Sequence, residues 1–389
     1  MSWNPPPGTE AYYSLPSPSS THSTLSQLLH RPPNGDPTWG RDSLPRSAEE
    51  EGVKEEYGAR DGRVYLDGKG EGEISEWVSY QVWEPKDGVE KKEADIVWCH
   101  GINDYGGKFS VHAPFFLDKG YRVVVPDLPS HGRSTGMHVH LESMEKLADA
   151  VYEVVKDVAL SDSQLVQEHK GAAGETHTTQ KRKIFIAGQS LGGFTAVYTC
   201  LKYGTPTTTS LPPSSGHDST HTYHPTLSGG IFLCPMLAIS PESRPSYLVE
   251  LAARGLSAVA GALPFAEANK GKNTEDPSVE EEFQADPQTY HGKLRIASGL
   301  AILKGLIDVN SRLSSLTLPF LLCHGTGDRV TSPSGSQLLH STASTAEEEK
   351  EIKLYEGYEH ILLRKGRDER DDVRRMRVLG DVGEWLERH

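Results

Sequence analysis

A series of short apolar runs, separated by amphipathic helical patterns, constrains the fold of this chain more than any other feature. Helical periodicity fills most of the gaps, around residues 111–119, 144–158, 192–201 and 335–343, and again from Val373 to the end. Short, fully apolar strands that alternate with helices indicate a buried, largely parallel sheet with helices on both faces, so the predicted class is α/β. The strand-like runs are EISEWVSYQVWEP (73–85), DIVWCHG (95–101), YRVVVPD (121–127), KIFIAG (183–188), GGIFLCP (229–235), LPFLLCHG (318–325) and EIKLYEG (351–357).

The rest of the chain divides around this series. Residues 1–56 are rich in Pro, Ser, Thr and Glu, which predicts a disordered tail whose removal would leave stability nearly unchanged. The predicted core comprises residues 57–235 and 316–389. Residues 236–315 interrupt the strand series with helical patterns; they read either as helices packed on the sheet or, since they start at a strand end, as a cap or lid. The polar stretches 161–181 and 204–227 are predicted to be surface insertions.

Composition and charge exclude several classes of function. A net charge of -14 over 389 residues argues against nucleic acid as a partner, because phosphate binding needs clustered Lys and Arg. The start MSWNPPPGTEAYY lacks the apolar core of a secretory signal, and no apolar run reaches the roughly 20 residues that cross a bilayer. Cys99, Cys200, Cys234 and Cys323 have no metal-ligand spacing and read as buried thiols. We therefore expect a cytoplasmic protein that is not secreted and holds no metal; its oligomeric state stays open.

The stretch KIFIAGQSLGGFTAVY contains the strongest chemical motif. Gly188-Gln189-Ser190-Leu191-Gly192 fits G-x-S-x-G, with an apolar strand before it and a helical pattern after it. Such a turn exposes the serine hydroxyl at the start of the helix, and its tightness requires the flanking glycines Gly188 and Gly192. The setting predicts Ser190 as a nucleophile.

A serine nucleophile needs a histidine base that a carboxylate orients. Asp328 follows the run 318–325 and His360 follows the run 351–357, in the chain order Ser, Asp, His that is typical of this motif. Parallel neighbouring strands bring both loops to the sheet edge where Ser190 lies. Asp308 is a weaker candidate for the acid, because it falls inside a helical pattern.

Two backbone N–H groups should bind the oxyanion of the tetrahedral intermediate. Leu191 directly follows the nucleophile, and Ile102 follows the first buried strand. His100, and the segment from Asp127 to Ser134, read as braces of the surrounding loops.

The same motifs resemble the monoacylglycerol lipase group of α/β-hydrolases. The resemblance covers about residues 73–388 and rests on HGINDYGGKF, VVVPDLPSHGRSTG, GQSLGGFTAVY, DPQTYHGKLRIASG, LPFLLCHGTGDRVTSP and KLYEGYEHILL. It implies an α/β-hydrolase fold with a helical cap over a hydrophobic channel, hydrolysis of a fatty acyl ester, and no cofactor. Ser190, Asp328 and His360 match the family triad, and Ile102 and Leu191 match its oxyanion positions. The chain departs from the family at Ile102-Asn103-Asp104-Tyr105 and at Ser130.

These expectations define a hypothesis about substrate and a set of alternatives. Apolar residues of the cap and of the strand end beneath it would bound a channel for one acyl chain: Tyr247, Leu248, Leu251, Met236 and Leu237. We expect cleavage of monoacylglycerol to fatty acid and glycerol through an acyl-enzyme on Ser190, at a protein that makes peripheral contact with membranes or lipid droplets. A lysophospholipase or a general carboxylesterase is the alternative, and the complete triad disfavours a non-catalytic ligand-binding protein.

Overall fold

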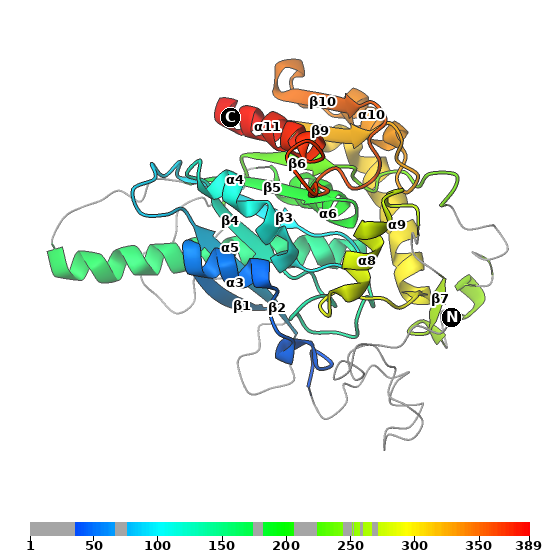
Figure 1. Cartoon of the computed structure of the whole chain (residues 1–389), viewed down its shortest axis with the longest axis horizontal. Helices are drawn as coiled ribbons and strands as arrows, with labels where there is room; N and C mark the ends of the chain where they lie inside the picture. Colours follow the sequence, from blue (N-terminus) through cyan, green and yellow to red (C-terminus); the bar gives the residue numbers. More distant parts are fainter. Residues whose placement is uncertain are drawn as a thin grey trace.

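The computed structural model describes residues 36–66, 76–173, 182–205, 224–243, 251, 253–256, 260–266 and 271–389. A central sheet of eight strands runs through this part of the chain, in the order β1-β2-β4-β3-β5-β6-β9-β10 (Figure 1). The strands are β1 (Gly58–Tyr65), β2 (Trp77–Glu84), β3 (Ala94–Cys99), β4 (Arg122–Pro126), β5 (Lys183–Gln189), β6 (Gly229–Leu233), β9 (Phe320–Gly325) and β10 (Lys350–Tyr355).

The strand pairing confirms the predicted class. β4, β3, β5, β6, β9 and β10 are parallel to one another, whereas β1 and β2 form an antiparallel edge beside β4. All seven predicted strand runs are present as β2 to β6, β9 and β10. The prediction missed β1, because its sequence GARDGRVY carries charges that suit an exposed edge strand and shows no apolar run.

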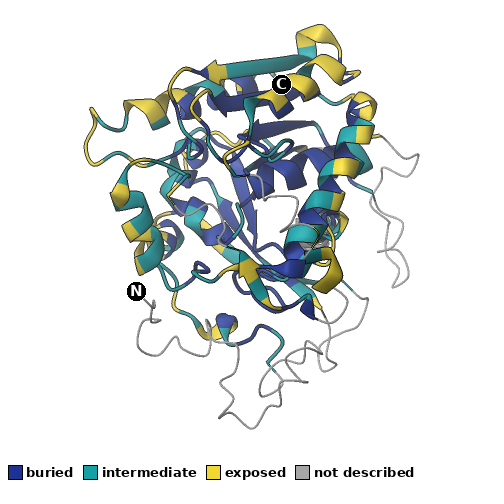
Figure 2. Cartoon of the chain, turned by 90° about the vertical axis from the view of Figure 1, so that its right-hand side faces the viewer, coloured by how far each residue is buried: buried dark blue, intermediate teal, exposed yellow. Residues whose placement is uncertain are grey.

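Helices cover both faces of the sheet and create two hydrophobic cores. One core packs α5 (Met144–Ala173), α6 (Leu191–Tyr203), α9 (Ile296–Arg312) and α10 (Pro333–Thr342) on the sheet. The other packs α3 (Ala48–Glu56), η3 (Gly106–Val111), α4 (Ala113–Leu117) and α11 (Val373–Arg388) on the opposite face. Figure 2 shows the buried strands between helices whose outer sides are exposed.

One of the two predicted polar insertions is partly helical. α5 continues to Ala173, so the prediction of a loop from residue 161 is wrong as far as residue 173. The stretch SDSQLVQEHKGAA is polar but contains many good helix formers, and helix propensity does not require an apolar face. Residues 174–181, and most of the insertion 204–227, lie outside the described residues.

The region between β6 and β9 contains a short strand pair as well as helices. Its described elements are β7 (Pro264–Ala266), α8 (Pro277–Ala285), β8 (Leu294–Arg295) and α9. β7 and β8 pair antiparallel, which the prediction of a purely helical cap did not include. Arg295 ties this region to the core, since Nε donates to the carbonyl of His138 at 2.7 Å and an Nη to that of Ala262 at 2.6 Å.

Residues 36–56 pack on the folded domain, so the prediction of a disordered tail is wrong for them. Arg41 is 1% exposed and donates hydrogen bonds to the carbonyls of Gly132, Ser134 and Gly136. Glu50, on α3, is fully buried. A prediction from low hydrophobicity fails for this segment because buried polar side chains hold it on the domain. The earlier part of the predicted tail, residues 1–35, lies outside the described residues.

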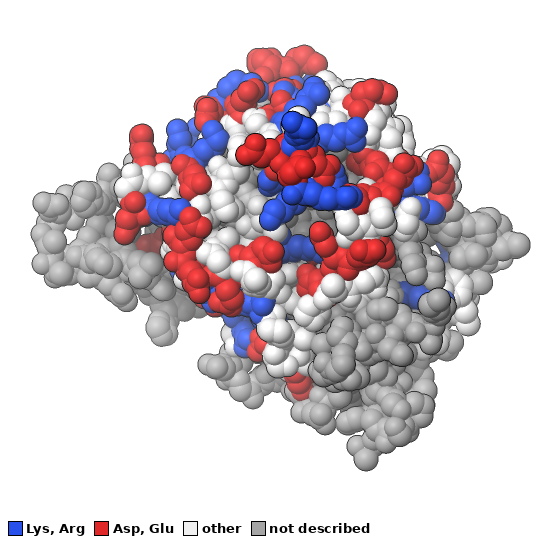
Figure 3. Space-filling view, in the orientation of Figure 1, with Lys and Arg blue, Asp and Glu red and all other residues white. Residues whose placement is uncertain are grey.

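Acidic and basic side chains are interspersed over the face seen in Figure 3. None of the described helices is long and apolar enough to cross a membrane.

All four cysteines are buried and free, as predicted, and burial raises the pKa of the Cys99, Cys200 and Cys323 thiols.

Candidate active site

Ser190 occupies the tight turn between β5 and α6. Its backbone, at φ 58° and ψ -118°, is in a conformation that non-glycine residues rarely adopt, as the motif predicts. A Cβ on Gly192 would lie 2.0 Å from the carbonyl oxygen of Cys99, and one on Gly188 would lie 2.5 Å from the backbone of Gly192. Both glycines are therefore required for the turn to pack beside β3.

Asp328 and His360 lie in the loops after β9 and β10, at the same edge of the sheet. His360 Nδ1 is 2.7 Å from Asp328 Oδ2, and both side chains are almost completely buried. Burial alone would raise the pKa of the Asp328 carboxyl group, but hydrogen bonds from His324 and His360 outweigh burial and hold that pKa well below its usual range. The carboxylate is thus charged at neutral pH and can orient the imidazole.

The competing acid is engaged elsewhere. Asp308, on α9, accepts a hydrogen bond from the Tyr198 hydroxyl at 2.6 Å and pairs with Arg312. The Tyr198 hydrogen bond lowers the pKa of the Asp308 carboxyl group. These contacts engage Asp308 with α6 and with its own helix α9, so the geometry favours Asp328 as the partner of His360.

Ile102 and Leu191 border the same site from two elements. Leu191 is the first residue of α6, where backbone N–H groups lack helical partners, and Ile102 follows β3. His100 braces this loop: Nδ1 donates to the carbonyl of Gly101 at 2.7 Å, and Nε2 accepts from the N–H of Leu128 at 2.9 Å. The bracing role predicted for His100 is confirmed.

The loop after β4 is braced in a similar way. Asp127 accepts hydrogen bonds from the N–H groups of Gly106 and Arg133, each at 2.8 Å. A Cβ on Gly132 would lie 2.2 Å from the Asp127 carboxyl carbon, so only glycine fits there. The predicted network around Asp127 is therefore present, and it connects the β4 loop to η3 beside the site.

A cavity of about 530 Å³ opens beside the nucleophile. Ser190, His360 and Ile102 all line it. Its apolar wall comes from β3, η3, α8 and the loop after His360, and consists of Trp98, Phe109, Val111, Val279, Phe283, Ile361 and Leu363. The rings of Trp98 and Phe109 stack 4.1 Å apart. A cavity of this size and lining suits a small ligand with one apolar part.

The wall differs from the predicted channel. Leu251 is 53% exposed, and Leu237 is buried in the core; neither they nor Met236 lines the cavity. Met236 is close to the nucleophile only through its N–H, which donates to the Ser190 carbonyl, and its side chain packs against the core. Tyr247 and Leu248 lie outside the described residues. The wall instead uses α8, whose Val279 and Phe283 share one helix face at i, i+4 spacing, a pattern that was visible in the sequence.

One cluster of potential metal ligands lies within the described residues, behind the site. Ligand atoms of Cys234, His324 and Asp328 lie within 4.8 Å of one another, and all three side chains are buried. Asp328 already accepts hydrogen bonds on both carboxylate oxygens, and burial raises the pKa of the Cys234 thiol well above its usual range. A neutral thiol and an occupied carboxylate describe a hydrogen-bonded cluster better than a cation site.

The sheet order, the strained serine turn and the acid–histidine pair define an α/β-hydrolase. The chain belongs to the family described as serine aminopeptidase, S33, whose model matches residues 90–211 and 217–366. Solved structures support the same fold: the monoglyceride lipase of Saccharomyces cerevisiae, in a soluble variant, superposes with a TM-score of 0.59 at 16% identity, over 84% of this chain and 94% of that one.

The relatives of this chain include monoacylglycerol lipases and a plant esterase. The chain is 29% identical to caffeoylshikimate esterase of Arabidopsis thaliana over 306 residues, which cover 78% of this chain and 80% of that protein. It is 25% identical to the monoacylglycerol lipase of Mycolicibacterium smegmatis, over 80% of this chain and 93% of that protein. The chain is therefore a monoacylglycerol lipase-like α/β-hydrolase.

Proposed function

We propose that this carboxylic ester hydrolase cleaves a monoacylglycerol into a fatty acid and glycerol. The observation that carries the proposal is the cavity, in which Ser190 and His360 share one space with an apolar wall. Such a wall holds an acyl chain, and polar residues that also line the cavity, among them Asn103, Gln189 and Gln284, can bind a small alcohol. The similarity to monoacylglycerol lipases supports the same substrate class.

The proposed reaction passes through an acyl-enzyme. Ser190 Oγ attacks the ester carbonyl carbon while His360 accepts the hydroxyl proton, and Asp328 stabilises the resulting imidazolium. The N–H groups of Leu191 and Ile102 bind the oxyanion. Collapse breaks the bond to the alcohol oxygen, which leaves as glycerol with the proton from His360. Water then attacks the acyl-enzyme by the same steps, releasing the fatty acid and restoring Ser190.

A phenolic acyl ester is the second candidate. The stacked rings of Trp98 and Phe109 offer a flat aromatic surface in the wall, which suits a planar acyl group. The similarity to caffeoylshikimate esterase supports this alternative. Lysophospholipids and short esters complete the set of substrates to be compared.

The substrate test is a profile of kcat/KM across acyl lengths. For monoacylglycerols, kcat/KM should rise roughly 4-fold for each methylene until the wall is covered, because each buried methylene contributes about 0.8 kcal/mol. A triacylglycerol emulsion should react much more slowly, since three chains do not fit in about 530 Å³. A flat dependence on length, or faster cleavage of lysophospholipids or caffeoyl esters, would reject monoacylglycerol as the substrate.

A pair of variants tests which wall holds the chain. Phe283→Ala should raise KM for a long-chain monoacylglycerol by about 10-fold, because it removes a ring that lines the cavity, and should leave a short nitrophenyl ester nearly unaffected. Leu251→Ala is the matched control, since Leu251 is exposed and does not line this cavity. If Leu251→Ala raised KM and Phe283→Ala did not, the acyl chain would bind along the originally predicted channel instead.

The proposed substrate implies contact with a lipid surface. Four apolar side chains of the segment between β6 and β8 are exposed: Leu251, Leu256, Leu263 and Phe265. Exposed apolar side chains of this kind can enter the boundary of a membrane or lipid droplet without spanning it.

A further inference from the structure

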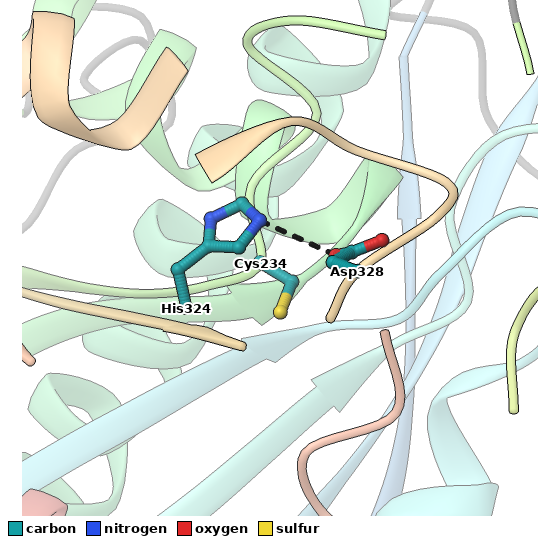
Figure 4. Close-up of side chains that lie close together, drawn as sticks. All are labelled: Cys234, His324 and Asp328. Atoms are coloured by element: carbon teal, nitrogen blue, oxygen red, sulfur yellow. Dashed lines mark ion pairs between the residues drawn. The ribbon is translucent and has the colours of Figure 1, made fainter. Parts of the chain in front are cut away.

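A second histidine lies beside the acid of the candidate triad. His324 is the next-to-last residue of β9 and is completely buried. Its Nε2 lies 3.3 Å from Asp328 Oδ2 (Figure 4). The same carboxylate oxygen is 2.7 Å from His360 Nδ1. The proposed chemistry uses only His360, which leaves His324 without an assigned role.

The surroundings of the ring determine which nitrogen carries the proton. Nε2 of His324 faces the Asp328 carboxylate and, at 3.2 Å, the carbonyl oxygen of Thr331, and neither group can donate. The Thr331 hydroxyl is farther from Nε2, at 3.5 Å, and donates to Asp328 Oδ2 at 2.8 Å. An unprotonated Nε2 would set its lone pair against both acceptors. Nδ1 lies 2.8 Å from the Ser336 hydroxyl, which can donate to it. These partners favour a proton on Nε2, which points it at the acid.

The hydrogen-bond donors to the Asp328 carboxylate come from different parts of the fold. Oδ1 accepts from the N–H groups of Val330 and Thr331 at 2.7 and 2.9 Å, and the Thr331 hydroxyl lies 2.8 Å from Oδ2. All three belong to the acid's own loop and move with it. His360 is the group that the acid must orient, so it does not anchor the acid.

His324 differs from these donors because it belongs to the sheet. β9 pairs with β6 on one side and β10 on the other, so its backbone is fixed in the same frame that carries Ser190. Among the described contacts of the carboxylate, His324 is the donor that lies within a strand. The thiol of Cys234, which also bonds Asp328, directly follows the end of β6. His324 can therefore tie Oδ2 directly to the sheet.

We propose that His324 is a positioning residue that anchors the Asp328 carboxylate to β9 and thereby aligns His360 with Ser190. The inference rests on the proposed serine hydrolase mechanism and adds a residue to it. An anchor of this kind affects the chemical step. It should not affect substrate binding, because His324 is not among the residues that line the cavity. Its removal should lower kcat and leave KM unchanged.

The test compares His324→Gln with His324→Met in the full chain. The two side chains are similar in length, and only Gln places an N–H near the position of Nε2. On a short nitrophenyl ester, Met should lower kcat about 10- to 100-fold, as for the loss of one hydrogen bond to a buried charge, with KM within about 2-fold. Gln should restore kcat to within about 5-fold of wild type. His324→Asn, whose amide is too short to reach Oδ2, should behave like Met and replaces it if Met does not fold.

Labelling of Ser190 by a fluorophosphonate separates this inference from the proposed function. Wild type should react quickly, Gln almost as quickly, and Met or Asn at least about 10-fold more slowly, with melting temperatures showing that each variant is folded. A wild-type protein whose Ser190 does not react would overturn the proposed mechanism and the inference with it. A reactive wild type, together with equal rates for the Gln and Asn variants, would overturn the role of His324 alone.

Discussion

Replacing Ser190 or His360 by alanine is expected to lower kcat by about 10⁶, and the double variant should be barely slower than either single one. The two residues are expected to act as one unit, so either loss disables the same step. They line one cavity, and His360 is held by a hydrogen bond of 2.7 Å to Asp328. The measurement is kcat on a short nitrophenyl ester, with the wild-type protein and both single variants purified in parallel.

The acid should have a smaller effect than the nucleophile. Asp328→Asn is expected to cost about 10⁴ in kcat, because the amide favours the wrong tautomer of His360 without removing the base. Asp308→Asn is the matched control, since Asp308 is engaged by Tyr198 and Arg312. Full activity in Asp328→Asn, with loss in Asp308→Asn, would move the acid to α9. Additive losses in Ser190→Ala and His360→Ala would argue against a single catalytic unit.

The sheet was predictable because its strands carry their own evidence. A parallel strand buried on both faces is apolar along most of its length, so it is recognised without knowledge of its neighbours. In β3 and β4 the exceptions are Asp95 and Arg122, which form a buried ion pair with each other. Loops at the carboxyl ends of such strands necessarily meet, which is why Ser190, Asp328 and His360 could be assigned to one edge. Local sequence patterns were therefore sufficient to predict these strands and the position of the loops at their ends.

Prediction failed where a residue depends on a partner far along the chain. Arg41 is buried because three carbonyls more than 90 residues away accept its hydrogen bonds, and no pattern around Arg41 reveals them. His324 looked like one more residue of an apolar strand, although its ring faces Asp328. The cavity wall on α8 was overlooked for a related reason: periodicity identifies an apolar face but does not say which surface that face covers.

The N-terminal segment makes the clearest case of such distant contacts. Glu50, on α3, accepts hydrogen bonds from the side-chain amides of Gln81, on β2, at 2.9 Å and Gln288 at 2.7 Å. Gln288 lies two residues before Tyr290, whose N–H donates to the carbonyl of Asn103 at 2.8 Å. Asn103 directly follows Ile102 in the candidate oxyanion loop. α3 therefore contacts the core and the segment that supports the site at the same time.

Removing residues 1–56 is accordingly expected to destabilise the protein strongly, contrary to the prediction of a dispensable tail. The deletion removes the buried side chains of Trp39 and Val53, each worth about 1.5–3 kcal/mol, and the hydrogen bonds from Gln81 and Gln288 to the Glu50 carboxyl group, worth about 1–3 kcal/mol each. A loss of about 5 kcal/mol or more is comparable to the whole stability of a typical domain. The melting temperature should fall by at least about 10 °C, or soluble protein should not be obtained.

A deletion of residues 1–35 alone is the control, because the difference between the two truncated proteins isolates residues 36–56. Two point variants locate the effect within that segment: Arg41→Met removes the hydrogen bonds to the β4 loop, and Glu50→Gln sets an amide N–H against donors. Each should lower the free energy of unfolding by about 1–3 kcal/mol, measured by urea titration. Equal melting temperatures for the two deletions would show that α3 contributes nothing to stability. Activity lost in Glu50→Gln at temperatures where the protein stays folded would show that the contact through Gln288 also supports the oxyanion loop.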